Sequence, residues 1–283
     1  MCAATGPSEG GELISSRRNP LVARLRHLHA PRGRREQGLL LLEGTHLLQE
    51  TLQLGLVPEL VLATPAWLER HGALWAALPA ATLLRRASEE VLAAAASTDH
   101  PDGVLFTLTP PSPAPPLSRP PSLVLALDRL QDPGNLGTLL RTALAAGVEQ
   151  VWLAEGADPW QPKVLRASSG AALALPLARF SRSGLADRLA AARAEGLAVV
   201  AAVLPSPACP APPPYWQRDW RRPTVLLLGN EGAGVDPALL ERVDAVVTIP
   251  HRSAVESLNV AVAAAPLLLE RCRQAAGGGA AEA

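Results

Sequence analysis

A proline-rich segment divides this chain into two parts that can fold separately. Seven of the fourteen residues at 109–122 are proline, and proline fixes φ and removes a backbone donor, so this segment can build neither a helix nor a central strand. We therefore expect a linker at 109–122, a first domain at 17–108 and a second at 123–275. The ends, 1–16 and 276–283, are rich in Gly, Ala or Ser and are expected to be disordered tails.

Beyond the linker, short apolar runs alternate with helical segments. The runs are near-continuous stretches of Val, Leu and Ala, which is typical of parallel strands covered by helices on both faces. We therefore expect an α/β domain with a parallel sheet. The expected strands are 123–127, 150–154, 174–177, 198–203, 225–228 and 245–249, and the expected helices are 135–146, 162–170, 185–195, 237–243 and 257–272.

The first domain repeats the alternation on a smaller scale. Asn19 and Pro20 can cap and open a helix whose apolar residues recur at helical spacing. The alternating strands and helices after it predict a small α/β domain. Its expected strands are 39–44, 59–63, 82–84 and 104–108, and its further helices are 45–54, 65–78 and 88–96.

Arginine is concentrated near the start of the first domain, although the formal net charge of the chain is zero. Between residues 13 and 37 there are seven arginines and a single acid, Glu36. Guanidinium groups match phosphate oxygens in pairs, which favours a phosphate-contacting surface; a solvated helix in an arginine-biased chain is the alternative. The contact residues we expect are Arg17, Arg18, Arg24, Arg26, Arg34 and Arg35.

Two motifs place polar residues and glycines at the ends of apolar runs, where parallel α/β folds bind ligands. The first motif, DPGNLGTLLRTA (132–143), carries Asn135, which can cap the following helix, and Arg141. The second motif, LLLGNEGAGV (226–235), has a G-x-x-G-x-G spacing with Glu231 at the strand end. Dinucleotide-binding folds use G-x-G-x-x-G instead, so the spacing argues against a nucleotide-dependent oxidoreductase.

The third motif, IPHRSAVESLNVAVA (249–263), is the most specific of the three. It ends a strand and begins the last helix, where Ser257 can serve as the N-cap and Asn259 follows two residues later. A further segment, KVLRASSGAALALP (163–176), carries Arg166, which either contacts phosphate or belongs to the structure of a helix end.

In order and spacing, the three motifs resemble those of the SpoU/TrmH family, S-adenosylmethionine-dependent RNA 2'-O-ribose methyltransferases of the SPOUT superfamily. The resemblance covers residues 123–272. It implies a trefoil knot tied at about 224–265, which periodicity alone would not reveal. It also implies a homodimer formed through the knotted domain and an amino-terminal ribosomal-protein-like (L30e-like) domain that binds RNA.

The resemblance assigns roles to the matching positions. The cofactor-binding residues would be Gly229, Ile249, Leu258 and Asn259. The catalytic residues would be Asn135, Arg141, Glu231, Ser257 and Asn259. A guanidinium is always protonated near neutral pH, so Arg141 would stabilise the developing alkoxide and grip the adjacent phosphate rather than act as a base. Glu231 would orient Arg141, and Asn135 would fix the ribose or the knot loop.

The favoured substrate is 23S rRNA, with guanosine as the favoured nucleoside. A whole domain precedes the linker, and the carboxyl-terminal tail has no basic extension that could grip tRNA. A tRNA 2'-O-methyltransferase and a noncatalytic RNA-binding knotted protein are the alternatives.

Other classes find little support in the composition. The three cysteines, Cys2, Cys209 and Cys272, are too scattered for a disulfide framework or a zinc site, and no metal is expected. The chain has neither an apolar run of about 18 residues nor a secretory leader, so we expect a cytoplasmic protein without a membrane span.

Overall fold

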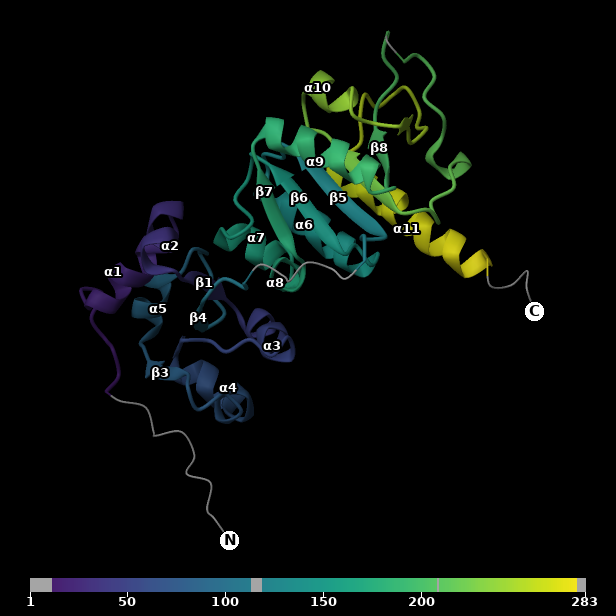
Figure 1. Cartoon of the computed structure of the whole chain (residues 1–283). Helices are drawn as coiled ribbons and strands as arrows, with labels where there is room; N and C mark the ends of the chain where they lie inside the picture. The colour runs from purple at the N-terminus through teal and green to yellow at the C-terminus, as the bar shows by residue number, and fades with distance from the viewer. Residues whose placement is uncertain (1–11, 113–118, 208, 279–283) are drawn as a thin grey trace. The chain divides into compact units, whose positions relative to one another are not determined.

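The computed structural model describes residues 12–112, 119–207 and 209–278 and contains two compact units (Figure 1). Unit 1 is Met1–Pro111 with Trp160–Leu173, and unit 2 is Ser112–Pro159 with Ala174–Ala283. The division between the units along the chain thus falls in the proline-rich segment. The segment Trp160–Leu173, which we expected inside the second domain, groups with unit 1 instead, because its helix packs on the first strand of that unit.

Unit 1 is a four-stranded mixed sheet with helices around it. The strand order is β1-β4-β2-β3, in which β4 runs antiparallel to β1 and β2, and β2 is parallel to β3. Its strands are β1 (Leu40–Glu43), β2 (Leu60–Ala63), β3 (Leu83–Arg86) and β4 (Val104–Leu108). Its helices are α1 (Pro20–His27), α2 (Pro31–Gln37), α3 (Thr45–Gln53), α4 (Pro65–Ala76), α5 (Glu89–Ala95) and α7 (Pro162–Ala167).

The beginning of unit 1 differs from the expectation at Ile14 and in the additional helix α2. The Asn19 side chain caps α1 by accepting from Leu21 N, as expected. Ile14, however, forms a bridge beside β3, where its N–H donates to Arg86 O and its carbonyl accepts from Ser88 N. The prediction of a disordered tail at 1–16 is therefore wrong at Ile14; residues 1–11 lie outside the described part of the chain.

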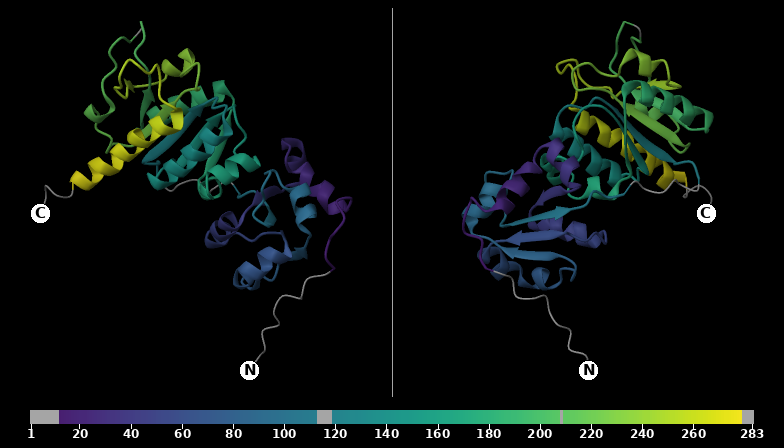
Figure 2. Two further views of the ribbon diagram at one scale, coloured as in Figure 1. Left: turned by 180° about the vertical axis from the view of Figure 1, so that it is seen from behind. Right: turned by 60° about the vertical axis from the view of Figure 1, so that its left-hand side comes forward.

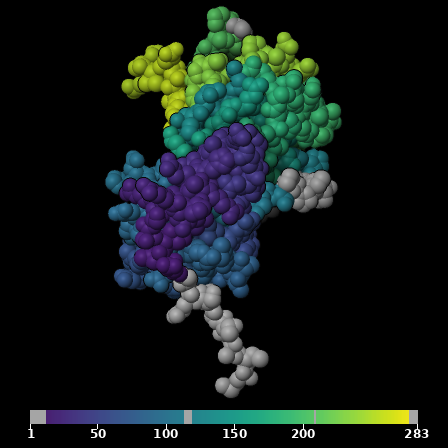
Figure 3. Space-filling view, turned by 90° about the vertical axis from the view of Figure 1, so that its left-hand side faces the viewer, coloured from purple at the N-terminus to yellow at the C-terminus, as the bar shows by residue number. Residues whose placement is uncertain are grey.

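Helices α1 and α2 belong to the purple part of the surface in Figure 3. Arg34 is only 6% exposed, and its Nη1 donates to the carbonyl oxygens of Leu28 and His29 at 2.9 and 2.8 Å. These carbonyls follow the end of α1 and would otherwise lack partners. The prediction that Arg34 contacts phosphate is therefore wrong. The other arginines of the predicted set are exposed: Arg17, Arg18, Arg24, Arg26 and Arg35.

Unit 2 is a six-stranded, wholly parallel sheet with the order β10-β8-β9-β5-β6-β7. Its strands are β5 (Leu123–Asp128), β6 (Gln150–Ala154), β7 (Leu177–Phe180), β8 (Ala198–Ala202), β9 (Thr224–Leu228) and β10 (Ala245–Val247). The helical elements of its chain are α6 (Pro133–Ala145), α9 (Arg182–Ala194), η1 (Tyr215–Gln217), α10 (Pro237–Leu240) and α11 (Val260–Gly278), and α8 (Ala171–Ala174) spans the boundary with unit 1.

Helices cover both faces of this sheet, because alternate strand residues point to opposite sides. Val124 and Ala126 of β5 belong to one buried cluster with Leu185 and Leu189 of α9. Leu125 lies between them and faces the other side, where α6 and α11 pack against each other (Figure 2). None of the described helices combines the length and the apolar character needed to cross a bilayer.

Three expected elements of the second domain shift in the structure, namely two helices and the strand between them in the prediction. The predicted helix 162–170 ends at Ala167, because Ser169 and Gly170 take positive φ values of 47° and 86°. Consequently the strand expected at 174–177 begins only at Leu177. The last helix starts at Val260 and continues to Gly278, so the tail predicted at 276–283 is helical as far as the structure describes it.

The connection between β8 and β9 forms hydrogen bonds with the carboxyl-terminal part of the chain. Tyr215 N donates to Thr248 O at 2.9 Å, and Trp220 N donates to Gln274 Oε1 at 2.8 Å. The knot implied by the motifs stays a prediction.

We expect Arg34→Ala to lower the free energy of unfolding by about 2–4 kcal/mol, because it removes buried hydrogen bonds and methylene groups together. Urea unfolding of the full chain measures this difference. Arg35→Ala, next to it and exposed, is the matched control and should change stability by no more than about 0.5 kcal/mol. Equal effects of the two substitutions would contradict the structural role of Arg34.

Candidate functional site

The turn after β5 and the loop after β9 lie side by side, because these strands are parallel neighbours. The carboxylate of Glu231 accepts from Gln131 N at 3.1 Å and from Asp132 N at 3.0 Å. The side chain of Asn230 donates from Nδ2 to Arg129 O at 2.8 Å. The loop of the second motif is therefore clamped to the turn that begins the first motif.

The loop after β9 has a shape that its sequence enforces. Asn230 Oδ1 accepts from Gly232 N and Ala233 N, both at 3.0 Å, which closes a tight turn. A Cβ atom on Gly229 would lie 2.1 Å from Gly234 C, so only glycine fits there. Gly234 itself has φ of +68°. Two of the three glycines of the second motif, Gly229 and Gly234, are thus required by this turn.

A chain of side-chain hydrogen bonds links all three motifs. Asn135 Nδ2 donates to Glu231 Oε1 at 3.2 Å, and Asn259 Nδ2 donates to Asn135 Oδ1 at 2.9 Å. Asn259 Oδ1 accepts from Ala261 N and Val262 N at the start of α11. Three residues that are far apart in the sequence, one from each motif, are therefore fixed relative to one another.

The two helix caps differ from the prediction. Asp132, not Asn135, caps α6, because its Oδ1 accepts from Asn135 N at 2.7 Å. Asn259, not Ser257, caps α11. Ser257 is exposed in the loop before that helix. The capping roles expected for Asn135 and Ser257 are therefore wrong, and the Asn135 side chain is free to join the motifs instead.

Arg141 lies apart from this chain of hydrogen bonds. It is exposed on α6, and no described residue forms an ion pair or hydrogen bond with its guanidinium. Both carboxylate oxygens of Glu231 are taken up by the first-motif turn and by Asn135. The prediction that Glu231 orients Arg141 is therefore wrong in this structure.

The pKa of Glu231 reflects its environment. Burial alone would raise this pKa, but hydrogen bonds from the backbone N–H groups of Asp132 and Gln131 and from Asn135 outweigh it and lower the pKa below the usual 4.5. The side chain is therefore a carboxylate at neutral pH, as an acceptor of several N–H groups must be.

A second carboxylate, which the sequence analysis did not single out, supports the same loop from the sheet side. Asp128, at the end of β5, is fully buried, and its Oδ2 accepts from Asp236 N at 2.9 Å. Arg182 bridges the pair, with Nη1 2.9 Å from Asp236 Oδ2 and Nε 3.6 Å from Asp128 Oδ1. Burial raises the pKa of Asp128, against the opposing Asp236 N–H and Arg182. The sequence signal that could have identified Asp128 is an acidic residue at the end of an apolar strand.

The residues predicted to hold the cofactor lie at the same edge of the sheet. Gly229 follows β9, Ile249 follows β10, and Leu258 precedes α11; all three are half-buried. Apolar side chains beside backbone groups suit an adenosine, whose base stacks on apolar groups and bonds to backbone. Among the described residues, no group of three or more His, Cys, Asp or Glu side chains is arranged to hold a metal ion.

Arg166 of α7 is held within unit 1. Its Nη1 donates to Glu43 Oε1 at 3.1 Å and to Ser97 Oγ at 2.6 Å, and the side chain is 30% exposed. The Glu43 carboxylate is almost fully buried. This contact favours the helix-end interpretation of the segment; an RNA contact of Arg166 stays a prediction.

Comparison with known proteins agrees with the motifs. Residues 122–269 match the SpoU rRNA Methylase family, and residues 19–105 match the MRM3-like substrate binding domain. An uncharacterized tRNA/rRNA methyltransferase of Synechocystis is 45% identical over 267 residues, which are 92% of this chain and 93% of that protein.

Two further proteins are similar over nearly their whole length. The 23S rRNA (guanosine(2553)-2'-O)-methyltransferase RlmP of Bacillus subtilis is 35% identical over 257 residues, covering 90% of this chain and 97% of RlmP. The crystal structure of an AdoMet-bound rRNA methyltransferase from Sinorhizobium meliloti superposes with a TM-score of 0.76 at 31% identity, covering 93% of this chain and 98% of that one.

The chain belongs to the SpoU rRNA methylase family. The predicted enzyme class, an RNA 2'-O-ribose methyltransferase that uses S-adenosylmethionine, is thereby confirmed. The α/β architecture with an amino-terminal substrate-binding domain and a carboxyl-terminal parallel-sheet domain is confirmed as well.

We expect Glu231→Gln to weaken S-adenosylmethionine binding and methyl transfer by about ten- to a hundredfold, because the new amide group faces the N–H donors of the first-motif turn and loses one acceptor. Calorimetric titration and single-turnover transfer measure the two effects. Glu241→Gln, exposed at the end of α10, is the control and should leave both near the wild-type value.

A comparison of wild type with Glu231→Gln also tests how the stability of the fold depends on pH. Because the folded pKa of Glu231 is depressed, its carboxylate stabilises the fold above a pH of about 4.5, and this contribution is lost as the pH falls through the folded pKa. The stability gap between wild type and Glu231→Gln should therefore close on acidification. A gap that stayed constant between about pH 7 and about pH 3 would contradict the assignment.

Proposed function

We propose that this methyltransferase acts on a ribose 2'-hydroxyl of 23S rRNA, with guanosine as the favoured nucleoside. The observation that carries the proposal is the hydrogen-bonded chain Glu231–Asn135–Asn259, which joins all three motifs at one edge of the sheet. The match to RlmP, a 23S rRNA guanosine 2'-O-methyltransferase, includes the amino-terminal domain and so supports the same class of RNA. A tRNA substrate is the alternative, since the similar Synechocystis protein is named for either RNA.

The residues of the site have separate roles in binding the cofactor and in positioning the ribose. Bound S-adenosylmethionine supplies an electrophilic methyl group. Gly229, Ile249 and Leu258 hold its adenosine part, through backbone groups and apolar contact. Asn135, fixed by Glu231 and Asn259, keeps one amide hydrogen for the ribose. Because both partners of the transfer are then held in register, positioning supplies much of the rate.

Arg141 acts on the RNA side of the reaction. Its guanidinium stays protonated, so it stabilises the oxygen that develops negative charge and grips the neighbouring phosphate. No acid of the described chain occupies this guanidinium, which leaves it available for phosphate. Ser257, exposed in the loop before α11, lies where it can meet the RNA as well.

The exposed arginines of the predicted set extend the contact with RNA into the substrate-binding domain; they are Arg17, Arg18, Arg24, Arg26 and Arg35. Their guanidinium groups bind the backbone without reading its sequence, so they contribute affinity that falls with salt.

A homodimer would complete the site. Leu144 on α6 and Val262 and Leu269 on α11 are 44%, 61% and 44% exposed, and the two helices pack against each other. We infer that this apolar face binds the same face of a second copy, as a two-fold interface does. Arg141 lies one turn from Leu144 on α6, so the partner would meet it at the interface.

We expect Val262→Glu to dissociate this dimer, because it places a charge in the centre of an apolar interface. Sedimentation of the full chain would show a monomer at concentrations where the wild type is a dimer. Val57→Glu is the matched control, since Val57 is 46% exposed in unit 1 and should leave the dimer intact. A Val262→Glu protein that sediments as the wild type does would refute the interface.

Labelled methyl transfer to total rRNA and total tRNA, prepared from a strain lacking the protein, tests the substrate. Label in a 2'-O-methylated guanosine of 23S rRNA is the expected result, and label confined to tRNA would overturn it.

We expect Arg141→Lys to lose at least about tenfold in turnover, because an ammonium cannot replace a bidentate guanidinium. Arg242→Lys, exposed elsewhere in unit 2, should keep normal turnover.

A further inference from the structure

Aromatic and cationic side chains gather on residues 215–222, YWQRDWRR, in the connection between β8 and β9. None of its residues belongs to the three motifs or to the apolar face proposed for the dimer, which is Leu144, Val262 and Leu269. Trp216 is 49% exposed, and its ring packs edge-on against Tyr215 with 5.1 Å between centroids and 76° between planes. A tryptophan ring that one neighbour holds in place and that is about half exposed offers a surface on which a planar ligand can stack.

The backbone of this segment is fixed to α11 and to its own buried tryptophan. Trp220 is 1% exposed, and its Nε1 donates to Tyr215 O at 2.7 Å. Gln274 accepts from Trp220 N and donates to Arg218 O, each at 2.8 Å. Arg271 Nη1 donates to the carbonyl oxygens of Trp220 and Arg222. The exposed side chains therefore stand on a rigid support.

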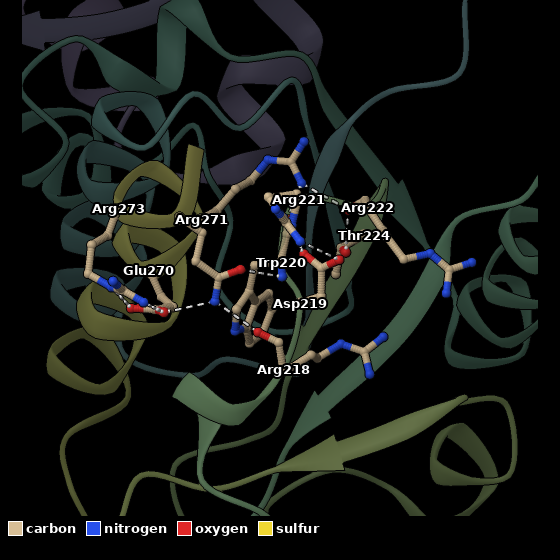
Figure 4. Close-up of polar contacts among 10 residues, drawn as sticks. Arg218, Asp219, Trp220, Arg221, Arg222, Thr224, Glu270, Arg271 and Arg273 are labelled. Atoms are coloured by element: carbon tan, nitrogen blue, oxygen red, sulfur yellow. Dashed lines mark hydrogen bonds and ion pairs between the residues drawn. The ribbon is translucent and has the colours of Figure 1, made fainter. Parts of the chain in front are cut away.

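The segment and the neighbouring turn of α11 contain five arginines and two acids, namely Arg218, Arg221, Arg222, Arg271 and Arg273 with Asp219 and Glu270. Arg221 pairs with Asp219 at 2.9 Å, and Arg273 pairs with Glu270 at 2.6 Å. No described carboxylate forms an ion pair with Arg222, whose side chain points away from the cluster in Figure 4. The surface therefore carries excess positive charge that the described chain does not neutralise.

Arg218 is the second cation of this region without a carboxylate partner among the described residues. Its Nε is buried and has no hydrogen-bond acceptor there, and burial lowers its pKa. The charge of Asp244 opposes this lowering of the pKa, but Asp244 is already paired with Arg193 at 2.7 Å. A half-buried guanidinium with an unused donor is stabilised by any anion that reaches it.

We infer that residues 215–222 form a second RNA-binding surface, on which a base of single-stranded RNA stacks on Trp216 while Arg218 and Arg222 hold the adjoining phosphates. An open aromatic ring beside unpaired guanidinium groups is the combination that proteins use for single-stranded nucleic acid. A protein partner would call for a larger apolar area, whereas prolines and cations surround this ring in the sequence.

The surface is connected directly to the catalytic edge. Tyr215 N donates to Thr248 O, and Thr248 N donates to Pro213 O, immediately before the loop of the third motif. RNA held at Trp216 therefore lies on the same backbone frame as the residues that bind the cofactor. This inference rests on the proposed function and deepens it, because it adds a contact within the methyltransferase domain for the RNA flanking the target ribose.

Binding of the full chain to a fluorescent single-stranded RNA of about 12 nucleotides tests the inference. Trp216→Ala should weaken the affinity about five- to a hundredfold, because a base stacked on an aromatic ring is lost, and Trp216→Phe should recover most of it. Arg222→Ala should reduce the slope of log Kd against log salt by about 0.7, as expected for one phosphate of a single strand.

Arg242→Ala is the matched control for charge, since it removes an exposed arginine of unit 2 outside this surface. Its salt slope should equal that of the wild type, because no phosphate contact is lost. S-adenosylmethionine affinity within about twofold of wild type would show that Trp216→Ala still folds. Unchanged RNA affinity in a folded Trp216→Ala protein would overturn the inference.

Sedimentation of the same variants separates RNA binding from subunit contact. A Trp216→Ala protein that becomes monomeric would assign the ring to the dimer and overturn the inference. The proposed function fails separately: a wild type that binds RNA through Trp216 but transfers no methyl to rRNA would refute the substrate and leave the RNA-binding surface standing.

Discussion

The clamp made by the Glu231 carboxylate is the interaction on which the rest of the site depends. Parallel strands bring the turn after β5 and the loop after β9 to one edge, but backbone geometry alone leaves both segments with unpaired N–H groups. A single side chain satisfies two of these groups and orients Asn135. The buried pair Asp128 and Asp236, bridged by Arg182, holds the same loop from the sheet side. The site is therefore pre-organised before any ligand arrives.

Much of this arrangement could be predicted from the sequence. The order of strands and helices follows from apolar periodicity, and the three motifs identified Asn135, Glu231 and Asn259. Their mutual hydrogen bonds could not be predicted, because they join residues about 100 apart in the chain. Helix caps were misplaced for a similar reason: Asp132, Asn135, Ser257 and Asn259 all have side chains that can cap, and tertiary partners decide which of them does.

The number of arginines in a segment is a weaker indicator of phosphate binding than the contacts that each guanidinium makes. The sequence counts charges, whereas the structure distinguishes a buried guanidinium bound to carbonyls, as in Arg34, from one without an anionic partner in the described chain, as in Arg222. A count of arginines favoured residues 13–37 as the RNA contact. It did not single out residues 215–222, where an aspartate and two tryptophans lower the density of positive charge. What matters for phosphate binding is the charge left after internal pairing, and that depends on contacts that no local window contains.

Asn259 has two tasks, since one of its side-chain atoms caps α11 and the other reaches Asn135. Helix α11 thus completes a site whose first part, the turn after β5, is more than a hundred residues earlier in the chain. During synthesis, the first and second motifs leave the ribosome while this connection is still missing. A nascent chain consequently cannot assemble the full constellation, and methylation of RNA has to wait until α11 has emerged and folded.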